Sequence, residues 1–300
     1  MLTQFGRDAH LRASRFALVI MEVRSVGIVG VGMMGGSIAL SALRAGYRVF
    51  LYDAFASEKL AGSKFRKALV VTDLAALVSN SRFIILATPP DALEQVGSDL
   101  SELVTPEHVV SDVASVKQSV AKVLTGQLRN RCEYVPAHPM AGSEKSGPEA
   151  ARDDLFTGAV TLLCPELAGD AASVPLVTGF WEELGTRVVL VSVALHDQLV
   201  AAMSHLPHLI AALLVKHVAG TNRAALDLCG PGFRDATRIA SGAPELWADI
   251  LLSNADAVQE QLRAFKTGLE EAMALLAERD AKKLQALLDD AKENRDRLST

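Results

Sequence analysis

The chain has 300 residues, of which 50% are hydrophobic and 22% charged, and its formal net charge is -5 at pH 7. This length is typical of two domains, and the composition allows each domain to bury a hydrophobic core. The acidic balance gives no electrostatic reason to expect nucleic acid or an anionic membrane as a partner, so an anionic substrate requires a local cluster of positive groups.

Residues 1–20 are predicted to be an N-terminal extension ahead of the fold. They contain Arg7, Arg12 and Arg15 and lead into an apolar run over residues 16–21. This run is too short for the apolar core of a signal peptide followed by a cleavage site. An upstream start codon, with Met21 as the functional beginning, explains the segment equally well.

Residues 21–191 are predicted to form an α/β domain of the Rossmann type, with a doubly wound parallel sheet. Residues 83–87 read F-I-I-L-A without alternation, as strands do when helices cover both faces of a parallel sheet. Alternating strand and helix patterns imply this sheet. The predicted strands are residues 25–30, 48–53, 83–88, 109–112, 132–136, 160–164 and 187–191, and the helices between them include residues 36–45, 92–100 and 115–124.

The glycine-rich run G-V-G-M-M-G at residues 30–35 lies between the first predicted strand and the first helix. Gly30 permits a tight turn, Gly32 lets the backbone approach a pyrophosphate, and Gly35 lets the helix pack closely on the strand. The helix N-terminus, with Met33 and Met34, is then free to bind the anion. This context favours a dinucleotide site over an ordinary glycine-rich turn.

Asp53 ends the second predicted strand, about 20 residues beyond the glycine loop. A carboxylate there accepts hydrogen bonds from the adenosine ribose and repels a 2′-phosphate, so we expect NAD rather than NADP. Capping of the next segment is the alternative role. Thr88 and Pro89, after a later strand, fit a loop beside the nicotinamide ribose, although a plain turn has the same composition.

Residues 192–300 are predicted to form an all-α domain, with helical patterns over residues 196–219, 245–275 and 281–297. Residues 201–219 are apolar almost all round, so we expect them to be buried on every side. A helical domain of this kind often completes its core against a second subunit, and we therefore expect a homodimer formed through these C-terminal helices. The apolar run over residues 206–220 falls short of the ~18–20 residues of a membrane span.

Two segments dense in polar residues follow later strands, where doubly wound sheets place their ligands. They are D-V-A-S-V-K at residues 112–117 and H-P-M-A-G-S-E-K-S-G at residues 138–147. With the glycine loop, H-D-x₆-S-H-L-P-H at residues 196–208 and G-F-R-D-A-T-R-I-A at residues 232–240, they resemble the prephenate dehydrogenase family. The resemblance covers roughly residues 24–255 in order.

The resemblance implies oxidative decarboxylation of the small molecule prephenate to 4-hydroxyphenylpyruvate, with hydride transfer to NAD, on the route to tyrosine. Hydride leaves ring carbon C4 while a base takes the proton of the C4 hydroxyl, and loss of carbon dioxide aromatises the ring. A neutral histidine suits this base because its pKa lies near the working pH.

The family pattern assigns His138 as the catalytic histidine and Ser115 as its partner on the substrate hydroxyl. Ser115 also suits the N-cap of the following helix, and both roles are compatible. Arg238 matches the arginine that binds a substrate carboxylate, for which its planar fork is suited. Other matching positions are Glu144, which could restrain Arg238 at the site entrance, Ser204, His205, His208 and Asp235 toward substrate, and Asp112 toward the cofactor. Trp247 also matches but suits packing, and His196 fits a structural or a functional role equally well.

No metal site is predicted. His205 and His208 can share a helical face, but no third ligand stands at helical spacing. Cys132, Cys164 and Cys229 are scattered and form no CxxC pair, so neither a zinc site nor a disulfide framework is indicated. The simplest interpretation is a cytoplasmic protein.

Three alternatives stay open. β-Hydroxyacid dehydrogenases share the glycine loop, but they follow a lysine of the central helix with asparagines, whereas Lys216 precedes H-V-A-G. A non-catalytic NAD-binding protein has no need of Ser115, His138 and Arg238 together. Arogenate differs from prephenate only in the side chain, and prephenate is favoured because Asp53 suggests NAD. We expect no fused mutase or regulatory domain, so tyrosine, if it inhibits, should compete at the active site.

Overall fold

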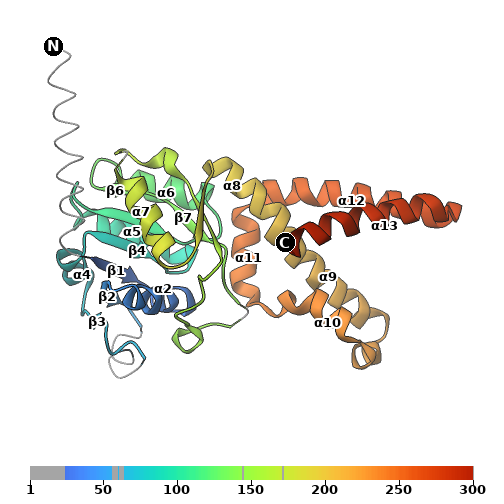
Figure 1. Ribbon diagram of the computed structural model, residues 1–300, viewed down its shortest axis with the longest axis horizontal. Coiled ribbons are helices and arrows are strands. Elements are labelled where there is room, and N and C mark those ends of the chain that lie inside the picture. The colour runs from blue at the N-terminus through green and yellow to red at the C-terminus, as the bar shows by residue number, and fades with distance from the viewer. Residues whose placement is uncertain (1–23, 56–59, 61–63, 144, 171, 300) are drawn as a thin grey trace, which may run out of the picture.

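The computed structural model describes residues 24–55, 60, 64–143, 145–170 and 172–299. An α/β part is followed by a part built of helices, and α12 and α13 extend away from the sheet (Figure 1). The predicted fold class is confirmed. The expectations for residues 1–20 and for Glu144 lie outside the described residues.

The main sheet has six parallel strands in the order β3-β2-β1-β4-β5-β6. This is the doubly wound order: successive strands are added in one direction from β1 to β3 and in the other from β4 to β6. The switch leaves a crevice at the carboxyl ends of β1 and β4. The strands are β1 Ser25–Val29, β2 Arg48–Tyr52, β3 Leu69–Val70, β4 Phe83–Leu86, β5 Val109–Asp112 and β6 Glu133–Tyr134.

Helices cover both faces of this sheet, as the unbroken apolar strands predicted. All four residues of β4 are buried. Ile85 belongs to one core cluster together with residues of α2 and α7, and Ile84 to the other together with residues of α4, α5 and α6. The helices are α2 Met33–Arg44, α4 Leu74–Asn80, α5 Leu93–Ser101, α6 Gln118–Leu128 and α7 Ser173–Glu183.

A second sheet of three strands stands apart from the main one, in the order β7-β8-β9. Its strands are β7 Ala137–Pro139, β8 Val160–Leu163 and β9 Arg187–Leu190. The pair β7 and β8 is antiparallel and the pair β8 and β9 is parallel. The alternating pattern predicted β8 and β9 but neither β7 nor the separate sheet.

The C-terminal part contains α8 Val193–Val200, α9 Leu206–Thr221, α10 Pro231–Thr237, α11 Pro244–Ser253, α12 Ala255–Glu278 and α13 Ala281–Asp296. A π-helical turn, Ala201–His205, joins α8 and α9 into one rod over Val193–Thr221. The helix predicted over residues 245–275 is two helices, because the backbone leaves helical geometry at Asn254. Short 3₁₀ helices, Arg223–Leu228 and Arg238–Ser241, flank α10.

The expectation that residues 201–219 are buried on every side is wrong for the single chain. Within α9 only His208 and Ala211 are buried, while Leu213 and Leu214 are exposed. The rod Val193–Thr221 is long and apolar enough to cross a membrane, with 28% of its most apolar window buried. The all-round apolar pattern therefore describes a helix of which this chain covers only one face.

Candidate active site

The glycine loop forms a tight turn between β1 and α2. Gly30 has φ of +88°, a conformation that side chains disfavour. A Cβ on Gly35 would lie 1.9 Å from the carbonyl oxygen of Gly30, so only glycine allows α2 to start so close to β1. A Cβ on Gly32 would meet nothing within 4 Å, which leaves its backbone open to an approaching ligand.

Two predicted cofactor residues border this loop. Oδ2 of Asp53 accepts a hydrogen bond from the amide of Val31 at 2.8 Å, so the carboxylate stands directly beside the glycine turn. Thr88 also lies against Gly30, and its hydroxyl oxygen is buried without a hydrogen-bond partner among the described residues. Met34 is partly buried, and its side chain packs on the core.

The loop that follows β7 reaches the glycine loop. The hydroxyl of Ser143 donates to Sδ of Met33 at 3.4 Å. A Cβ on Gly142 would lie 3.7 Å from Cε of the same methionine. The strand that carries His138 is thereby tied to the start of α2.

A buried ion pair holds the end of β5. Lys117 and Asp112 are both fully buried, with Nζ 2.5 Å from Oδ1. Oδ2 of Asp112 accepts a hydrogen bond from the hydroxyl of Tyr134 at 2.7 Å, and Nζ of Lys117 also donates to the carbonyl of Ala114 at 2.8 Å. These bonds fix the segment that carries Ser115.

His138, His196 and Asp197 form a hydrogen-bonded triad. Nδ1 of His138 lies 2.9 Å from Nε2 of His196, and Nδ1 of His196 lies 2.7 Å from Oδ1 of Asp197. All three side chains are buried. His138 comes from β7 and the other two from α8, so the triad joins the sheet part to the helical part.

The carboxylate of Asp197 also binds the N-terminus of α6. Its Oδ1 accepts the amide of Lys117 at 2.8 Å and its Oδ2 the amide of Gln118 at 2.9 Å. Burial alone raises the pKa of Asp197, but the hydrogen bonds from His196 and the two amides outweigh it, and the net pKa is lowered. Asp197 is therefore an anion at neutral pH.

His205 and His208 face the same tryptophan. The ring of His208 stacks on Trp247 at 3.5 Å between centroids, and the ring of His205 meets it edge-on at 6.3 Å. Nδ2 of Asn254 lies 3.2 Å from Nδ1 of His205 and donates to the carbonyl of Asp197 at 2.8 Å. Nδ1 of His208 is buried and has no hydrogen-bond partner in the part of the chain that the structure describes.

The π-helical turn Ala201–His205 explains how these histidines sit in one rod with Pro207. Proline lacks an amide hydrogen, and its ring clashes with the preceding turn of a regular α-helix. A π-helical turn relaxes that turn and is frequent at functional sites. The sequence showed the proline but not the turn.

Burial keeps the histidines of the site neutral. It lowers the pKa of His138 well below 6.5, and His196, Lys117 and His205 lower it further. Burial likewise lowers the pKa of His196, that of His205 to about 4, and that of His208. At neutral pH these rings are bases or hydrogen-bonding groups, not cations.

The remaining predicted residues are less closely placed. Ser115 is partly buried and does not cap α6, because that helix begins at Gln118 and its first amides bind Asp197 instead. Arg238 and Asp235 are exposed, and the 3₁₀ helix that Arg238 opens packs against α9. Of the other predicted site residues, Ser204 is partly buried in the π-helical turn and Pro89 is exposed in the segment after β4.

Sequence reasoning missed Asp197, Asn254 and the charge of Lys117 as site residues. Asp197 and Lys117 stood inside the quoted motifs, so the available signal was a charged residue within a motif, without its partners. Asn254 lay inside a predicted helix, and nothing in its neighbourhood marked it.

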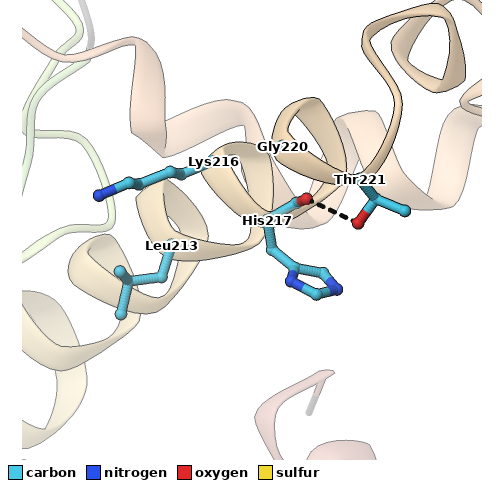
Figure 2. Close-up of a pocket in the computed structure, with 5 residues that line it drawn as sticks. All are labelled: Leu213, Lys216, His217, Gly220 and Thr221. Carbon is cyan, nitrogen blue, oxygen red and sulfur yellow. Dashed lines mark hydrogen bonds between the residues drawn. The ribbon is translucent and has the colours of Figure 1, made fainter.

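No metal cluster competes with this site among the described residues. Within the described ranges, no three histidine, cysteine, aspartate or glutamate side chains could hold a metal ion together. Figure 2 shows an open hollow along the outer face of α9, where the hydroxyl of Thr221 donates to the carbonyl of His217 at 3.0 Å. Its lining, which includes Lys216, comes from α9 alone, so it is a helix surface and not a substrate site.

Comparisons with known proteins assign both parts of the chain to one family of models. Residues 38–190 match the family model described as prephenate dehydrogenase, nucleotide-binding domain, and residues 192–290 match prephenate dehydrogenase, dimerization domain. Cyclohexadienyl dehydrogenase of Zymomonas mobilis is 32% identical over 265 residues, which cover 86% of this chain and 90% of that protein.

Solved structures agree with these matches. Prephenate dehydrogenase from A. aeolicus, in complex with hydroxyphenyl propionate and NAD+, superposes with a TM-score of 0.84 at 32% identity, covering 92% of this chain and 99% of that chain. Synechocystis arogenate dehydrogenase superposes with a TM-score of 0.79 at 28% identity, covering 91% and 99%.

We expect Lys117→Met to lower the free energy of unfolding by ~3–5 kcal/mol, because it leaves Asp112 as a buried charge without its cation. The double variant Asp112→Asn/Lys117→Met, which buries no charge, should recover most of this loss. Urea denaturation followed by circular dichroism measures both. A loss below ~1 kcal/mol in the single variant would show that the pair does not hold the β5 segment.

Proposed function

The chain belongs to the prephenate dehydrogenase family, and we propose that it oxidatively decarboxylates prephenate to 4-hydroxyphenylpyruvate with NAD+ as hydride acceptor, in tyrosine biosynthesis. One observation carries the proposal. His138 is a buried, neutral histidine on β7, and the loop after β7 contacts Met33 of the glycine loop. A base and a dinucleotide site are thus adjacent.

The residues around the crevice fit NAD. Gly32 leaves space for the pyrophosphate at the N-terminus of α2, where the helix favours negative charge. The carboxylate of Asp53 suits the ribose hydroxyls and repels a 2′-phosphate. The buried hydroxyl of Thr88 beside Gly30 has no hydrogen-bond partner in the described part of the chain, and it supplies a further hydrogen-bonding group. NAD+, when bound, takes up the hydride from C4 of the substrate ring.

His138 then acts as the base. Its imidazole takes the proton of the C4 hydroxyl as the hydride leaves C4, so that a ketone forms there. The bond from C1 to the carboxylate then breaks and carbon dioxide leaves. Its electron pair passes through the ring to the C4 oxygen, so that the ring becomes aromatic, and the protonated His138 returns the proton to that oxygen to give the 4-hydroxyl group. Ser115, on the segment fixed by Asp112 and Lys117, orients the same hydroxyl.

The substrate carboxylates need donors from the helical part. His208 offers a buried Nδ1 without a partner among the described residues, on a ring held flat by Trp247. Arg238 provides the cation and a planar fork, on a 3₁₀ helix that packs against α9. Ser204, His205, Asp235 and Glu144 complete the proposed set.

Arogenate is the second candidate substrate, because a Synechocystis arogenate dehydrogenase is among the similar structures. The two substrates differ at the side chain, near Arg238 and His208 in our assignment. A β-hydroxyacid dehydrogenase is not supported, since both family models are those of prephenate dehydrogenase.

We further propose that the enzyme is a cytoplasmic homodimer. The C-terminal region matches a dimerization domain, and the exposed stripe of α12, defined as Phe265, Leu269, Met273 and Leu276, lies on one helix face. The rod Val193–Thr221 carries His196 and Asp197, whose side chains are buried against the sheet part. We therefore assign a second copy of this chain, and not lipid, as the partner that covers the exposed stripe of α12 and the uncovered apolar face of the rod.

Formation of NADH, recorded at 340 nm, tests the reaction. Prephenate with NAD+ should turn over fastest among the four pairs of prephenate or arogenate with NAD+ or NADP+. Faster turnover of arogenate would show that arogenate, not prephenate, is the preferred substrate. Faster turnover with NADP+ would show that NADP+, not NAD+, is the preferred cofactor. Silence with all four pairs, from folded protein that binds NAD+, would overturn the proposal.

His138→Asn should lower kcat by about 10²–10⁴-fold with little change in KM, because only proton transfer is lost. In the wild type, kcat/KM should fall only at pH below 6.5, since burial lowers the pKa of His138 and protonation removes the base. In His138→Asn, kcat/KM should not show this fall at low pH. A large rise in KM with kcat preserved would contradict the base assignment.

The double variant Leu269→Glu/Met273→Glu should convert the dimer to monomer, because it places two charges in the exposed stripe of α12. Light scattering after size-exclusion chromatography gives the mass. Thr267→Glu/Ala274→Glu, which adds the same charge to the opposite face of α12, is the control and should stay dimeric. Monomeric wild-type protein at micromolar concentration would contradict the proposal.

A further inference from the structure

We propose that His196 and Asp197 are positioning residues that hold His138 in the tautomer protonated at Nδ1, so that the lone pair of Nε2 is presented to the substrate hydroxyl. The inference rests on the proposed function for the identity of the hydroxyl. The tautomer itself follows from the hydrogen bonds of this chain, and it can be tested without substrate.

The direction of the hydrogen bonds is set at Asp197. Both of its oxygens accept from backbone amides at the start of α6, those of Lys117 and Gln118. Backbone amides cannot reverse their role, and the N-terminus of a helix favours an anion. The carboxylate is therefore ionised and can only accept.

The role of Asp197 as acceptor fixes which nitrogen of His196 carries the hydrogen. Because Asp197 only accepts, the nitrogen 2.7 Å from it, Nδ1 of His196, carries the hydrogen. A neutral imidazole has one N–H, so Nε2 of His196 is an acceptor. Burial disfavours the doubly protonated ring, which keeps this assignment at neutral pH.

His196 in turn fixes the tautomer of His138, the base. Nε2 of His196, an acceptor, lies 2.9 Å from Nδ1 of His138, so that nitrogen carries the hydrogen. Nε2 of His138 is then bare, and it makes no hydrogen bond to any residue the structure describes. A carboxylate that fixes the tautomer of a base histidine is the arrangement of hydrolase triads. Here a second histidine stands between the carboxylate and the base.

The arrangement also suits the protonated state. When Nε2 of His138 takes the substrate proton, the ring becomes a cation and keeps its Nδ1 hydrogen bond to His196 without moving. Burial, His196, Lys117 and His205 all lower the pKa of His138, and the carboxylate of Asp197 lies one ring away from it, beyond His196. Because Asp197 comes from α8 and His138 from β7, the base is correctly set only when the two parts of the molecule are docked.

Two substitutions of His196 distinguish positioning from packing. His196→Gln keeps the polarity, since its amide group can donate to Asp197 and its oxygen can accept from Nδ1 of His138. His196→Leu fills the space but removes the acceptor. We expect kcat to fall about 10²-fold or more in the leucine variant, with KM nearly unchanged, and to stay within about 10-fold of wild type in the glutamine variant.

Nitrogen-15 NMR of the imidazole of His138, in the protein without substrate, supplies the independent readout. The wild type and His196→Gln should show the Nδ1–H tautomer, and His196→Leu a mixture or the Nε2–H form. Thermal midpoint and NAD+ binding are measured for each variant to establish folding.

Three results would overturn the inference in folded, NAD+-binding protein. They are a leucine variant with kcat within about 3-fold of wild type, a glutamine variant as slow as the leucine variant, and an unchanged tautomer in the leucine variant. If the wild type turned over no substrate, the proposed function would be overturned instead. The tautomer of His138 could still be determined by NMR, because that measurement needs no substrate.

Discussion

The carboxylate of Asp197 accepts hydrogen bonds from two backbone amides at the start of α6, and these two bonds connect the sheet part to the helical part. A third bond, from the ring of His196, lies within α8. A buried anion is costly unless it is fully hydrogen-bonded. The cost is offset only when α8 is docked on the start of α6, so the same bonds align the parts and set the base. Asn254 adds a bond to the backbone of Asp197 and thereby brings the start of α12 to the same point.

Charge is distributed so that the base stays neutral while its surroundings stay ionic. Lys117 is a fully buried cation paired with Asp112, and its field lowers the pKa of both His138 and His196. Asp197 acts in the opposite direction on His196, through a hydrogen bond. His138 is therefore unprotonated at neutral pH, and the anion Asp197 lies near it when it accepts a proton. Both features suit a base that takes a proton from a hydroxyl.

Local patterns in the sequence predicted five strands of the main sheet, the glycine turn and the helical character of the C-terminal part, because each depends on neighbours within a few residues. The two-residue edge strand β3 was not predicted. The three-residue strand β7, which contains Pro139, carried no such pattern. Ser115 was given the N-cap of α6, but a carboxylate 80 residues away binds the amide of Lys117 instead. Bonds of this range are a property of the folded topology, so Asp197 and Asn254 could not be placed from sequence spacing.

The exposed apolar side of α9 has a related cause. One side of the rod Val193–Thr221 carries His196, His205 and His208 toward the sheet part and Trp247, and the other side carries exposed leucines. A helix with polar functional groups in one interface and apolar groups in another is apolar overall and shows little amphipathic contrast, which is why its sequence indicated burial all round. His196, His205 and His208 all belong to the continuous rod Val193–Thr221, with His205 at the end of the π-helical turn. Any shift of this rod against its apolar partner surface would therefore also move Nε2 of His196 relative to His138. The uncovered apolar side of the rod and the residues proposed to position the base therefore belong to one continuous helical element, which a partner at the apolar side would hold in place.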